Sequence, residues 1–337
     1  MPTITLADTG QRYECAPDDT LSRAGLRAGL GLPYECNVGC CGTCKVELVE
    51  GEVESQWPEA PALTERDRAK RRILGCQSRP RTDCTIKARL TDMPAEMPRP
   101  QRFTAHLRHV RDLTHDIREF QFEADTPAQF LPGQYVLFSL KGVPGARAYS
   151  MANVPDAMRH WHFQVKRVPG GRCTATLFDV LRVGDAVDLD GPYGQAYLRT
   201  DSPRDIVCIS GGSGLSPVIS ITSTFAREPK LAGRKLHFFY GGRGPADIIG
   251  EEMLRELPGF GERIFYYPAI SMAELDTAGS WKGKVGFVHE YAKEVLGENL
   301  RDYEYYFAGP PGMTMAVQRM LIQGKVPFAQ IHFDQFF

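Results

Sequence analysis

The chain has 337 residues, enough for two or three domains, and an ordinary composition with 42% hydrophobic and 24% charged residues. Its formal net charge of −1 lacks the basic excess typical of nucleic-acid binding, and no run of about 20 apolar residues predicts a membrane span. The first residues do not resemble a secretory signal, so we expect a cytoplasmic protein, with no nucleic acid and no membrane among its partners.

Nine cysteines need an explanation other than disulfides, which rarely persist in the cytoplasm. Cys36, Cys41 and Cys44 have the spacing C-x4-C-x2-C, and residues 45–75 separate them from Cys76. This spacing is typical of the thiolate ligands of a plant-type [2Fe–2S] cluster. Glycines at positions 39 and 42 allow a tight loop to fold around such a cluster. We predict these four cysteines as its ligands.

Two alternatives concern the same loop. Cys41 and Cys44 also form the C-x2-C pair of a zinc site, although a zinc ribbon needs a second such pair or two histidines. Cys40 is a possible ligand in place of Cys41, but the four-residue gap after Cys36 favours Cys41. The other cysteines are expected to pack as small apolar side chains: Cys15, Cys84, Cys173 and Cys208.

The pattern of the chain changes twice after this region. The proline-rich segment 92–101 has no periodicity and predicts an extended linker. Short alternating segments up to about residue 200 predict an antiparallel barrel or sandwich. After Pro203, apolar strands alternate with helical stretches, which predicts a parallel α/β sheet. The expected domains are 1–93, a linker at 94–101, 102–200 and 201–337. The expected strands are 45–49, 84–90, 104–110, 117–122, 135–140, 160–168, 186–189, 205–210, 235–240, 263–268 and 303–308, and the expected helices include 217–227 and 312–323.

Residues 147–150 offer chemistry suited to a flavin. Arg147 supplies a planar guanidinium for a diphosphate, Tyr149 a ring to stack on a planar cofactor, and Ser150 a hydroxyl. Taken alone, a surface arginine and a core tyrosine explain this short motif equally well.

Glycines follow an apolar strand in the last third of the chain. Residues 211–214 read Gly-Gly-Ser-Gly at a strand-to-helix turn, where backbone N–H groups can approach a pyrophosphate. A flexible turn is the alternative for this motif alone. Residues 239–243 and 308–313 also end in glycine-containing turns after strands, which favours a nucleotide site.

Resemblance to known families connects these motifs. Residues 1–90 resemble a plant-type ferredoxin, which implies a β-grasp domain. Motifs at 131–135, 147–150, 171–174 and 191–194 resemble, in order, those of the ferredoxin-NADP⁺ reductase family, which implies an antiparallel β-barrel binding FAD and a parallel α/β domain binding NAD(P). The implied FAD residues are Arg147, Ala148, Tyr149, Ser150, Val165, Lys166, Gly171, Cys173, Thr174 and Phe337. The implied NAD residues are Gly212, Ser213, Gly214, Gly241, Arg243, Gly309, Pro310 and Met313. Ala308 stands where that family commonly has a cysteine, so no catalytic thiol is assigned.

Over almost its full length the chain resembles reductase components of bacterial multicomponent oxygenases, such as those of toluene 4-monooxygenase and carbazole 1,9a-dioxygenase. The motifs 33–36, 147–153, 286–290 and 332–337 carry this resemblance. It implies a relay from NADH through FAD and a [2Fe–2S] cluster to another protein, in the breakdown of aromatic compounds. That partner is expected to be a Rieske ferredoxin or a Rieske oxygenase; the alternative is the hydroxylase of a di-iron monooxygenase. A flavin-bearing redox sensor without turnover is the competing non-enzymatic hypothesis.

Overall fold

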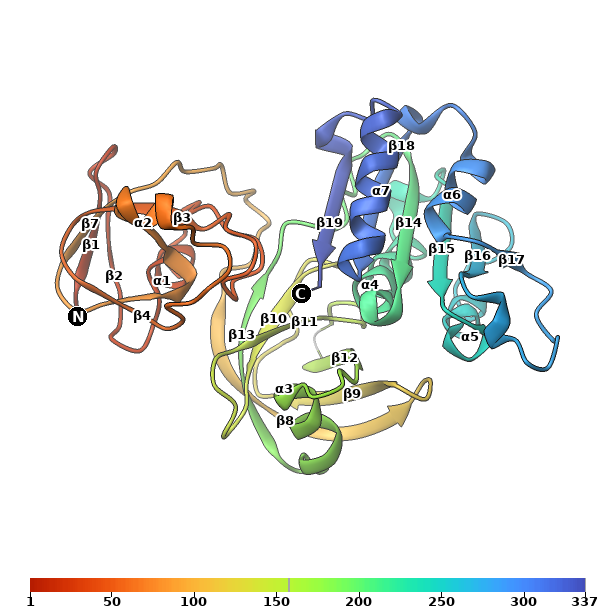
Figure 1. The fold of residues 1–337 in the computed structure, drawn as a ribbon, viewed down its shortest axis with the longest axis horizontal. Helices are drawn as coiled ribbons and strands as arrows, with labels where there is room; N and C mark the ends of the chain where they lie inside the picture. Colours follow the sequence, from red (N-terminus) through yellow and green to blue (C-terminus); the bar gives the residue numbers. More distant parts are fainter. Residues whose placement is uncertain (157, 337) are drawn as a thin grey trace. The chain divides into compact units, whose positions relative to one another are not determined.

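A computed structural model describes residues 1–156 and 158–336. The backbone divides into two compact units, and each is treated by itself below. Unit 1 comprises Met1–Phe103, Val136–Ala148 and Asp188–Gly194, and unit 2 comprises Thr104–Tyr135, Tyr149–Val187 and Gln195–Phe337. Figure 1 traces the strands and helices along the chain.

The N-terminal region of unit 1 is a five-stranded sheet with a helix on one face. The strand order is β2-β1-β7-β3-β5, with β1 parallel to β7 and the other neighbours antiparallel. Alternating apolar residues of the sheet form one core with Leu21 and Ala24 of the helix. This arrangement confirms the β-grasp prediction. The elements are β1 (Thr3–Leu6), β2 (Arg12–Glu14), α1 (Leu21–Arg27), β3 (Lys45–Glu50), β4 (Val53–Ser55), α2 (Glu65–Ala69), β5 (Arg72–Leu74), β6 (Ser78–Pro80) and β7 (Cys84–Lys87).

Six further strands form an antiparallel, barrel-like sheet. Their order is β11-β10-β13-β8-β9-β12. In unit 2, β9 alternates buried residues such as Phe120 and Phe122 with less buried ones, as a strand with one face in a core must. The antiparallel barrel prediction is confirmed. The strands are β8 (Gln101–Asp112), β9 (Ile117–Ala124), β10 (Tyr135–Ser139), β11 (Arg147–Ser150), β12 (His160–Lys166) and β13 (Ala186–Tyr193), and the short helix α3 spans Arg172–Ala175.

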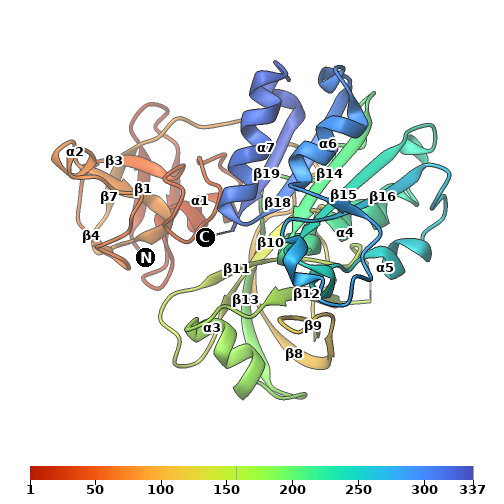
Figure 2. The ribbon, with the colours of Figure 1, turned by 45° about the vertical axis from the view of Figure 1, so that its right-hand side comes forward.

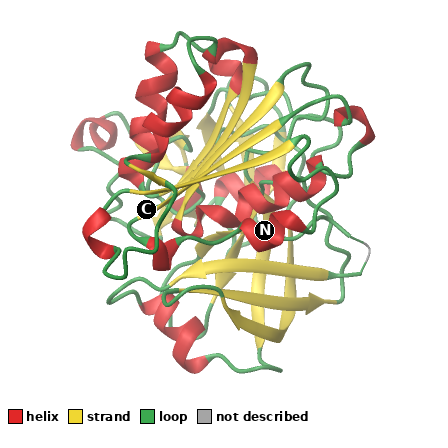
Figure 3. Cartoon of the chain, turned by 90° about the vertical axis from the view of Figure 1, so that its right-hand side faces the viewer, coloured by secondary structure: helices red, strands yellow, loops and turns green. Residues whose placement is uncertain are grey.

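The C-terminal part of unit 2 is a parallel sheet covered on both faces by helices (Figures 2 and 3). Its order is β17-β16-β15-β14-β18-β19, and all neighbouring strands run parallel. Helices α4 and α5 pack on one face, and α6 and α7 pack side by side on the other. The elements are β14 (Asp205–Gly211), α4 (Leu215–Phe225), β15 (Leu236–Gly242), α5 (Glu251–Arg255), β16 (Ile264–Ile270), β17 (Lys284–Val285), α6 (Val288–Leu296), β18 (Tyr303–Gly309), α7 (Pro311–Gln323) and β19 (Ile331–Gln335).

This topology places a binding crevice at a definite edge of the parallel sheet. From β14 the chain continues to β15 and β16 on one side, and later to β18 and β19 on the other. The switch of direction therefore lies between β14 and β18. In open α/β sheets, ligands bind beyond the carboxyl ends of the strands at such a point.

Candidate cofactor sites

The loop between α1 and β3 carries three of the four predicted cluster ligands. Its backbone has positive φ at Asn37, Gly39 and Gly42, so the chain turns sharply between the cysteines. A Cβ atom at Gly39 would lie 3.1 Å from side-chain atoms of both Trp57 and Gln77, which is a tight contact. Glycine at this position therefore serves both the conformation and the close packing of the loop.

The four predicted ligands come together as two pairs of thiols. The Sγ atoms of Cys44 and Cys76 are 3.1 Å apart, and both residues are buried. The Cys36 Sγ accepts a hydrogen bond from the Cys41 backbone N–H at 3.4 Å. Hydrogen bonding from the Cys41 side chain lowers the pKa of Cys36 to about 7, which favours the thiolate that a metal ligand must be. All nine cysteines are free, so no disulfide competes for these four.

Cys40 stands outside these two pairs. Its thiol is half-buried, and burial raises its pKa. The convergence of Cys36, Cys41, Cys44 and Cys76 fits a [2Fe–2S] cluster. Cys15, Cys84 and Cys208 are packed in apolar cores.

The predicted flavin motif lies on β11. Arg147 is exposed, and its Nη1 contacts the carbonyl oxygens of Pro144 and Ala146 in its own loop; Ala148 is exposed as well. Ser150 is buried, and its carbonyl accepts a hydrogen bond from the Ser216 hydroxyl at 2.7 Å. Tyr149 donates from its hydroxyl to Cys173 Sγ at 3.2 Å.

Helix α3 begins at the predicted diphosphate segment. A Cβ atom at Gly171 would lie 2.8 Å from the Thr174 hydroxyl oxygen, so a larger residue there would displace the Thr174 side chain. The first turn of a helix directs N–H groups outward without acceptors of its own, which suits an anion. The Thr174 hydroxyl oxygen accepts from the Val168 N–H at 3.2 Å and lies 3.1 Å from the Gly171 carbonyl oxygen. Thr174 therefore also fixes the loop before the helix. Val165 is buried in β12.

A cavity of about 570 Å³ lies in unit 2 at the carboxyl ends of β14, β15 and β16 and the starts of α6 and α7. This is the edge that the sheet topology marks as a ligand site. Among the predicted nucleotide residues, those lining it are Gly212, Gly241, Arg243, Pro310 and Met313.

Two close backbone approaches shape this edge. A Cβ atom at Gly214 would lie 2.0 Å from the Ala308 carbonyl oxygen, and one at Gly309, with φ of 150°, would lie 2.9 Å from the Gly211 carbonyl oxygen. These glycines let β14 and β18 end in close contact. Gly214, Gly309 and Ser213 do not line the cavity.

Charged side chains in and beside the cavity form pairs of opposite sign. Arg243 pairs with Asp247 at 2.8 Å and with Asp116 at 3.4 Å, and Lys166 pairs with the same Asp116 carboxylate at 3.0 Å. The hydrogen bond to Asp247 raises the pKa of Arg243. Burial opposes ionisation of Asp247, but hydrogen bonds from Arg243 keep its pKa below the usual value. Two cations and two anions therefore face one another.

Lys166, which the resemblance implies for FAD, lies at the end of β12 and lines this cavity; its FAD assignment stays a prediction. Phe337, the predicted terminal aromatic contact, lies outside the described residues. Several lining residues were not predicted: Tyr240, Asp247, Ser271, Phe287 and His289. The 286–290 motif places a glycine before a helix, and this is the signal in the sequence that points to this edge.

None of the helices in residues 1–156 and 158–336 is long and apolar enough to cross a bilayer.

Three family models match the chain in succession. They are the 2Fe-2S iron-sulfur cluster binding domain at residues 4–81, the oxidoreductase FAD-binding domain at 104–197 and the oxidoreductase NAD-binding domain at 208–319. The matched segments coincide with the cysteine loop, the barrel sheet and the cavity-bearing parallel sheet.

The chain is also similar to known proteins over nearly the full length of both partners. The chain is 40% identical over 332 residues to the ferredoxin–NAD(P)⁺ reductase CarAd of Metapseudomonas resinovorans, covering 96% of each chain. It is 34% identical to the phenol 2-monooxygenase reductase component DmpP of Pseudomonas sp. strain CF600, over 99% of this chain and 94% of the relative. The solved ferredoxin reductase in carbazole 1,9a-dioxygenase is similar with a TM-score of 0.90 and 37% identity, over 100% of this chain and 98% of that one.

These matches explain why the cysteine loop, the arginine-bearing strand β11 and the glycine-edged cavity occur in one chain. The protein is an oxidoreductase with [2Fe–2S], FAD and NAD binding domains, and it belongs to the family of ferredoxin–NAD(P)⁺ reductases.

Proposed function

We propose that this protein is the NADH-oxidising reductase component of an aromatic-ring oxygenase system. One observation carries the proposal: four converging thiols occur in the same chain as a 570 Å³ cavity at a topological switch point. NADH delivers two electrons together, and the cluster accepts one at a time. Bound FAD supplies the step between them, because it takes up an electron pair and releases electrons singly.

We assign the residues to three tasks. Cys36, Cys41, Cys44 and Cys76 hold the cluster. The β11 motif and the start of α3 hold FAD, with Arg147 and the α3 N–H groups facing the diphosphate, Tyr149 against the ring, and Ser150 bonding its edge. Remaining FAD contacts are assigned to Ala148, Val165, Cys173 and Phe337. The cavity at the ends of β14 and β15 holds the nucleotide, with Gly212, Gly241, Pro310 and Met313 near it and Ser213, Gly214 and Gly309 shaping the edge.

NADH is the preferred donor in this proposal. The 2′-phosphate of NADPH requires free positive charge, and an acidic group instead favours the 2′-hydroxyl of NADH. In the cavity, Arg243 is already paired with Asp247 and Asp116, and Lys166 with Asp116. Because both cations are already paired with carboxylates, neither is free for a 2′-phosphate, and this supports NADH as the donor.

The electron acceptor is proposed to be a Rieske ferredoxin or the terminal oxygenase of a Rieske dioxygenase. The 0.90 TM-score with the carbazole 1,9a-dioxygenase reductase supports this partner class. A di-iron monooxygenase is the second candidate, supported by 34% identity with a phenol 2-monooxygenase reductase. A cytoplasmic location is proposed because cluster assembly needs reduced thiols. The proposed domain bounds remain 1–93, 102–200 and 201–337, within which all three family matches fall.

The test is NADH oxidation by the purified holoprotein with ferricyanide, then with candidate oxygenase components and an aromatic substrate. Product formation with a Rieske component supports the first partner class, and product formation with a di-iron hydroxylase supports the second. A fully loaded holoprotein that does not oxidise NADH contradicts the reductase proposal. A colourless protein containing zinc contradicts the cluster assignment.

A further inference from the structure

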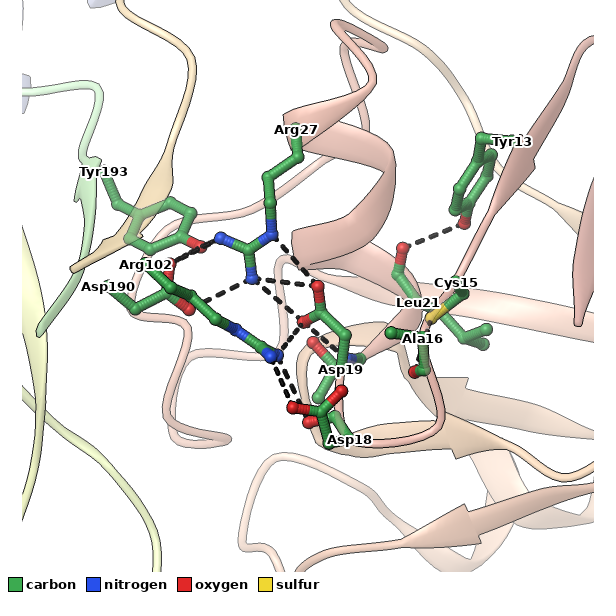
Figure 4. Close-up of polar contacts among 11 residues, drawn as sticks. Tyr13, Cys15, Ala16, Asp18, Asp19, Leu21, Arg27, Arg102, Asp190 and Tyr193 are labelled. Atoms are coloured by element: carbon green, nitrogen blue, oxygen red, sulfur yellow. Dashed lines mark hydrogen bonds and ion pairs between the residues drawn. The ribbon is translucent and has the colours of Figure 1, made fainter. Parts of the chain in front are cut away.

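Arg27 joins two distant parts of unit 1 through its guanidinium. It lies in the last turn of α1 and faces Asp19, in the preceding loop, and Asp190, on β13 (Figure 4). Its Nε donates to Asp19 Oδ2 at 3.0 Å, while its Nη1 and Nη2 donate to the two oxygens of Asp190 at 2.6 and 3.1 Å. Its Nη2 also reaches Asp19 Oδ1 at 3.0 Å. One arginine thus makes bidentate contact with two carboxylates.

Further residues fix this arrangement. Arg102, at the start of β8, pairs with Asp19 at 3.1 Å and with Asp18 at 2.6 Å. The Tyr193 hydroxyl donates to Asp190 Oδ1 at 2.8 Å. We call these side chains the Arg27 network (Asp18, Asp19, Arg27, Arg102, Asp190 and Tyr193). It connects the iron–sulfur family segment, 4–81, with β13 of the FAD-binding family segment, 104–197.

The network is shielded from solvent at its centre. The side chains of Asp19 and Asp190 are 7% and 11% exposed, and that of Arg27 is 22% exposed. The planar fork of arginine matches two carboxylates in a way that lysine cannot. Removing Arg27 leaves two poorly hydrated carboxylates close together, which is far less favourable than losing an exposed ion pair.

Helix α1 connects this network to the cluster loop. Arg23, one turn before Arg27, donates from Nη2 to the carbonyl oxygen of Asn37, next to the ligand Cys36, at 3.0 Å. The same end of β13 contacts the segment before that ligand, because the Tyr34 and Tyr193 rings meet edge-to-face at 6.0 Å. The Gly194 N–H donates to the Tyr34 hydroxyl at 3.3 Å. The cluster loop is therefore linked to β13 by charged and aromatic contacts.

We propose that Arg27 and Asp190 are positioning residues for electron transfer from the flavin to the cluster. Their ion pair holds the cluster-bearing segment on β13, with Asp19 and Arg102 orienting the Arg27 guanidinium. Neither residue touches the nucleotide cavity, so the pair acts on the second electron-transfer step and not on NADH oxidation. This role rests on the proposed function of the three cofactor sites.

The test compares wild type with Arg27→Ala, Arg27→Lys and Asp190→Asn as loaded holoproteins in anaerobic stopped flow. Flavin reduction by NADH is expected to stay within about twofold of wild type, while cluster reduction slows on the order of tenfold in Arg27→Ala, because small misplacements strongly affect reactions between held groups. The rate of cluster reduction in Arg27→Lys is expected to lie between those of wild type and Arg27→Ala, because lysine keeps the positive charge but lacks the planar guanidinium. Arg81→Ala is the control, because Arg81 forms an exposed pair with Glu54 in the same segment.

A second readout does not depend on turnover. Protease cleavage within residues 88–100, between β7 and β8, is expected to accelerate in Arg27→Ala and Asp190→Asn but not in Arg81→Ala. The Arg27→Ala/Asp190→Asn double variant should be no slower in cluster reduction than Arg27→Ala, because the two residues share one contact. The inference is overturned if Arg27→Ala changes neither the rate of cluster reduction nor the rate of cleavage. It is also overturned if the two substitutions slow cluster reduction by factors that multiply in the double variant. If wild type itself does not oxidise NADH, the proposed function is refuted. The cleavage rates then still show whether the Arg27 network holds the two segments together.

Discussion

Asp247 holds the guanidinium of Arg243 in a bidentate pair, with Nε to Oδ2 at 2.8 Å and Nη2 to Oδ1 at 3.0 Å. The pair lies at the carboxyl end of β15, in the lining of the cavity that we propose for NADH. In that proposed site, Arg243 is already paired with a carboxylate and is not free to bind a 2′-phosphate. We therefore expect nucleotide preference to depend on the pair and not on Arg243 alone.

Asp247→Asn is expected to shift preference toward NADPH. Removing the negative charge leaves Arg243 with only its longer pair to Asp116 and reduces repulsion of a phosphate. The ratio of kcat/KM for NADPH to that for NADH should therefore rise roughly tenfold, or about 1.4 kcal/mol. Steady-state ferricyanide reduction with each nucleotide measures the ratio. Asp179→Asn, at an exposed pair with Arg167, is the matched control. An unchanged ratio in Asp247→Asn would show that Asp247 does not select the nucleotide.

Substitution of Cys40 and of its neighbour Cys41 should have different effects on the amount of cluster bound. Cys40→Ser is expected to keep the visible absorption of the cluster, because Cys40 stands outside the two thiol pairs. Cys41→Ser is expected to lose most of the cluster, because the other three thiolates cannot complete its ligand set. Iron content and visible spectra after identical purification measure this. The opposite result would assign the ligand to Cys40.

Ser216→Ala tests the contact of α4 with β11 and β12 in unit 2. The buried Ser216 hydroxyl donates to the Ser150 carbonyl at 2.7 Å and accepts from the Gln164 N–H at 3.3 Å. Its loss removes a hydrogen bond from each of two buried backbone groups and should cost about 1 kcal/mol. The thermal unfolding midpoint should therefore fall. Ser223→Ala, on the same helix and more exposed, should change it little; equal midpoints for both variants would remove any role for the Ser216 contact.

Glu304 should make stability depend on acid pH. It is buried, and its carboxylate contacts His332 at 2.6 Å and the Ser202 hydroxyl at 2.8 Å. Burial alone would raise its pKa, but the hydrogen bond from His332 and that from Ser202 hold it below the usual 4.5. A carboxyl with a lowered folded-state pKa stabilises the fold fully above its unfolded value and loses that contribution as pH falls through the folded value.

Glu304→Gln should accordingly be less stable than wild type at pH 7, with the difference shrinking as pH falls below about 4.5. Urea unfolding at a series of pH values measures the difference. Exposed Glu298→Gln is the control and should follow wild type throughout. A gap between Glu304→Gln and wild type that stays constant down to pH 3 would contradict the lowered pKa.

Elements with clear periodicity were predictable from sequence. Helix 312–323 and strand 135–140 were predicted within one residue of α7 and β10, because each combines apolar spacing with flanking turn residues. The three-residue strands β2, β4, β5 and β6 were missed because so short a segment has no measurable period. The predicted strand 84–90 was too long, since β7 ends at Lys87.

The convergence of the four predicted cysteines was predictable because one short loop supplies three of them. The charge balance of the nucleotide cavity was not, because Asp116 comes from the turn before β9 and meets Arg243 only through the fold, 127 residues apart in sequence. Lys166, at the end of β12, lines the same cavity, which its position in the sequence does not reveal. The partners Arg27 and Asp190, 163 residues apart, show no common pattern in the sequence.

The connection between β7 and β8 makes the contact of α1 with β13 an intramolecular contact between two tethered segments. Residues 88–100 contain no helix or strand and join the two contacting segments covalently. A short tether of this kind keeps its ends at an effective concentration in the millimolar range. A contact with a dissociation constant near that value would be occupied about half the time within one molecule and would be undetectable between separate chains. The tether thus lets a weak contact between the cluster-bearing segment and β13 re-form after each opening, because the two segments cannot diffuse apart.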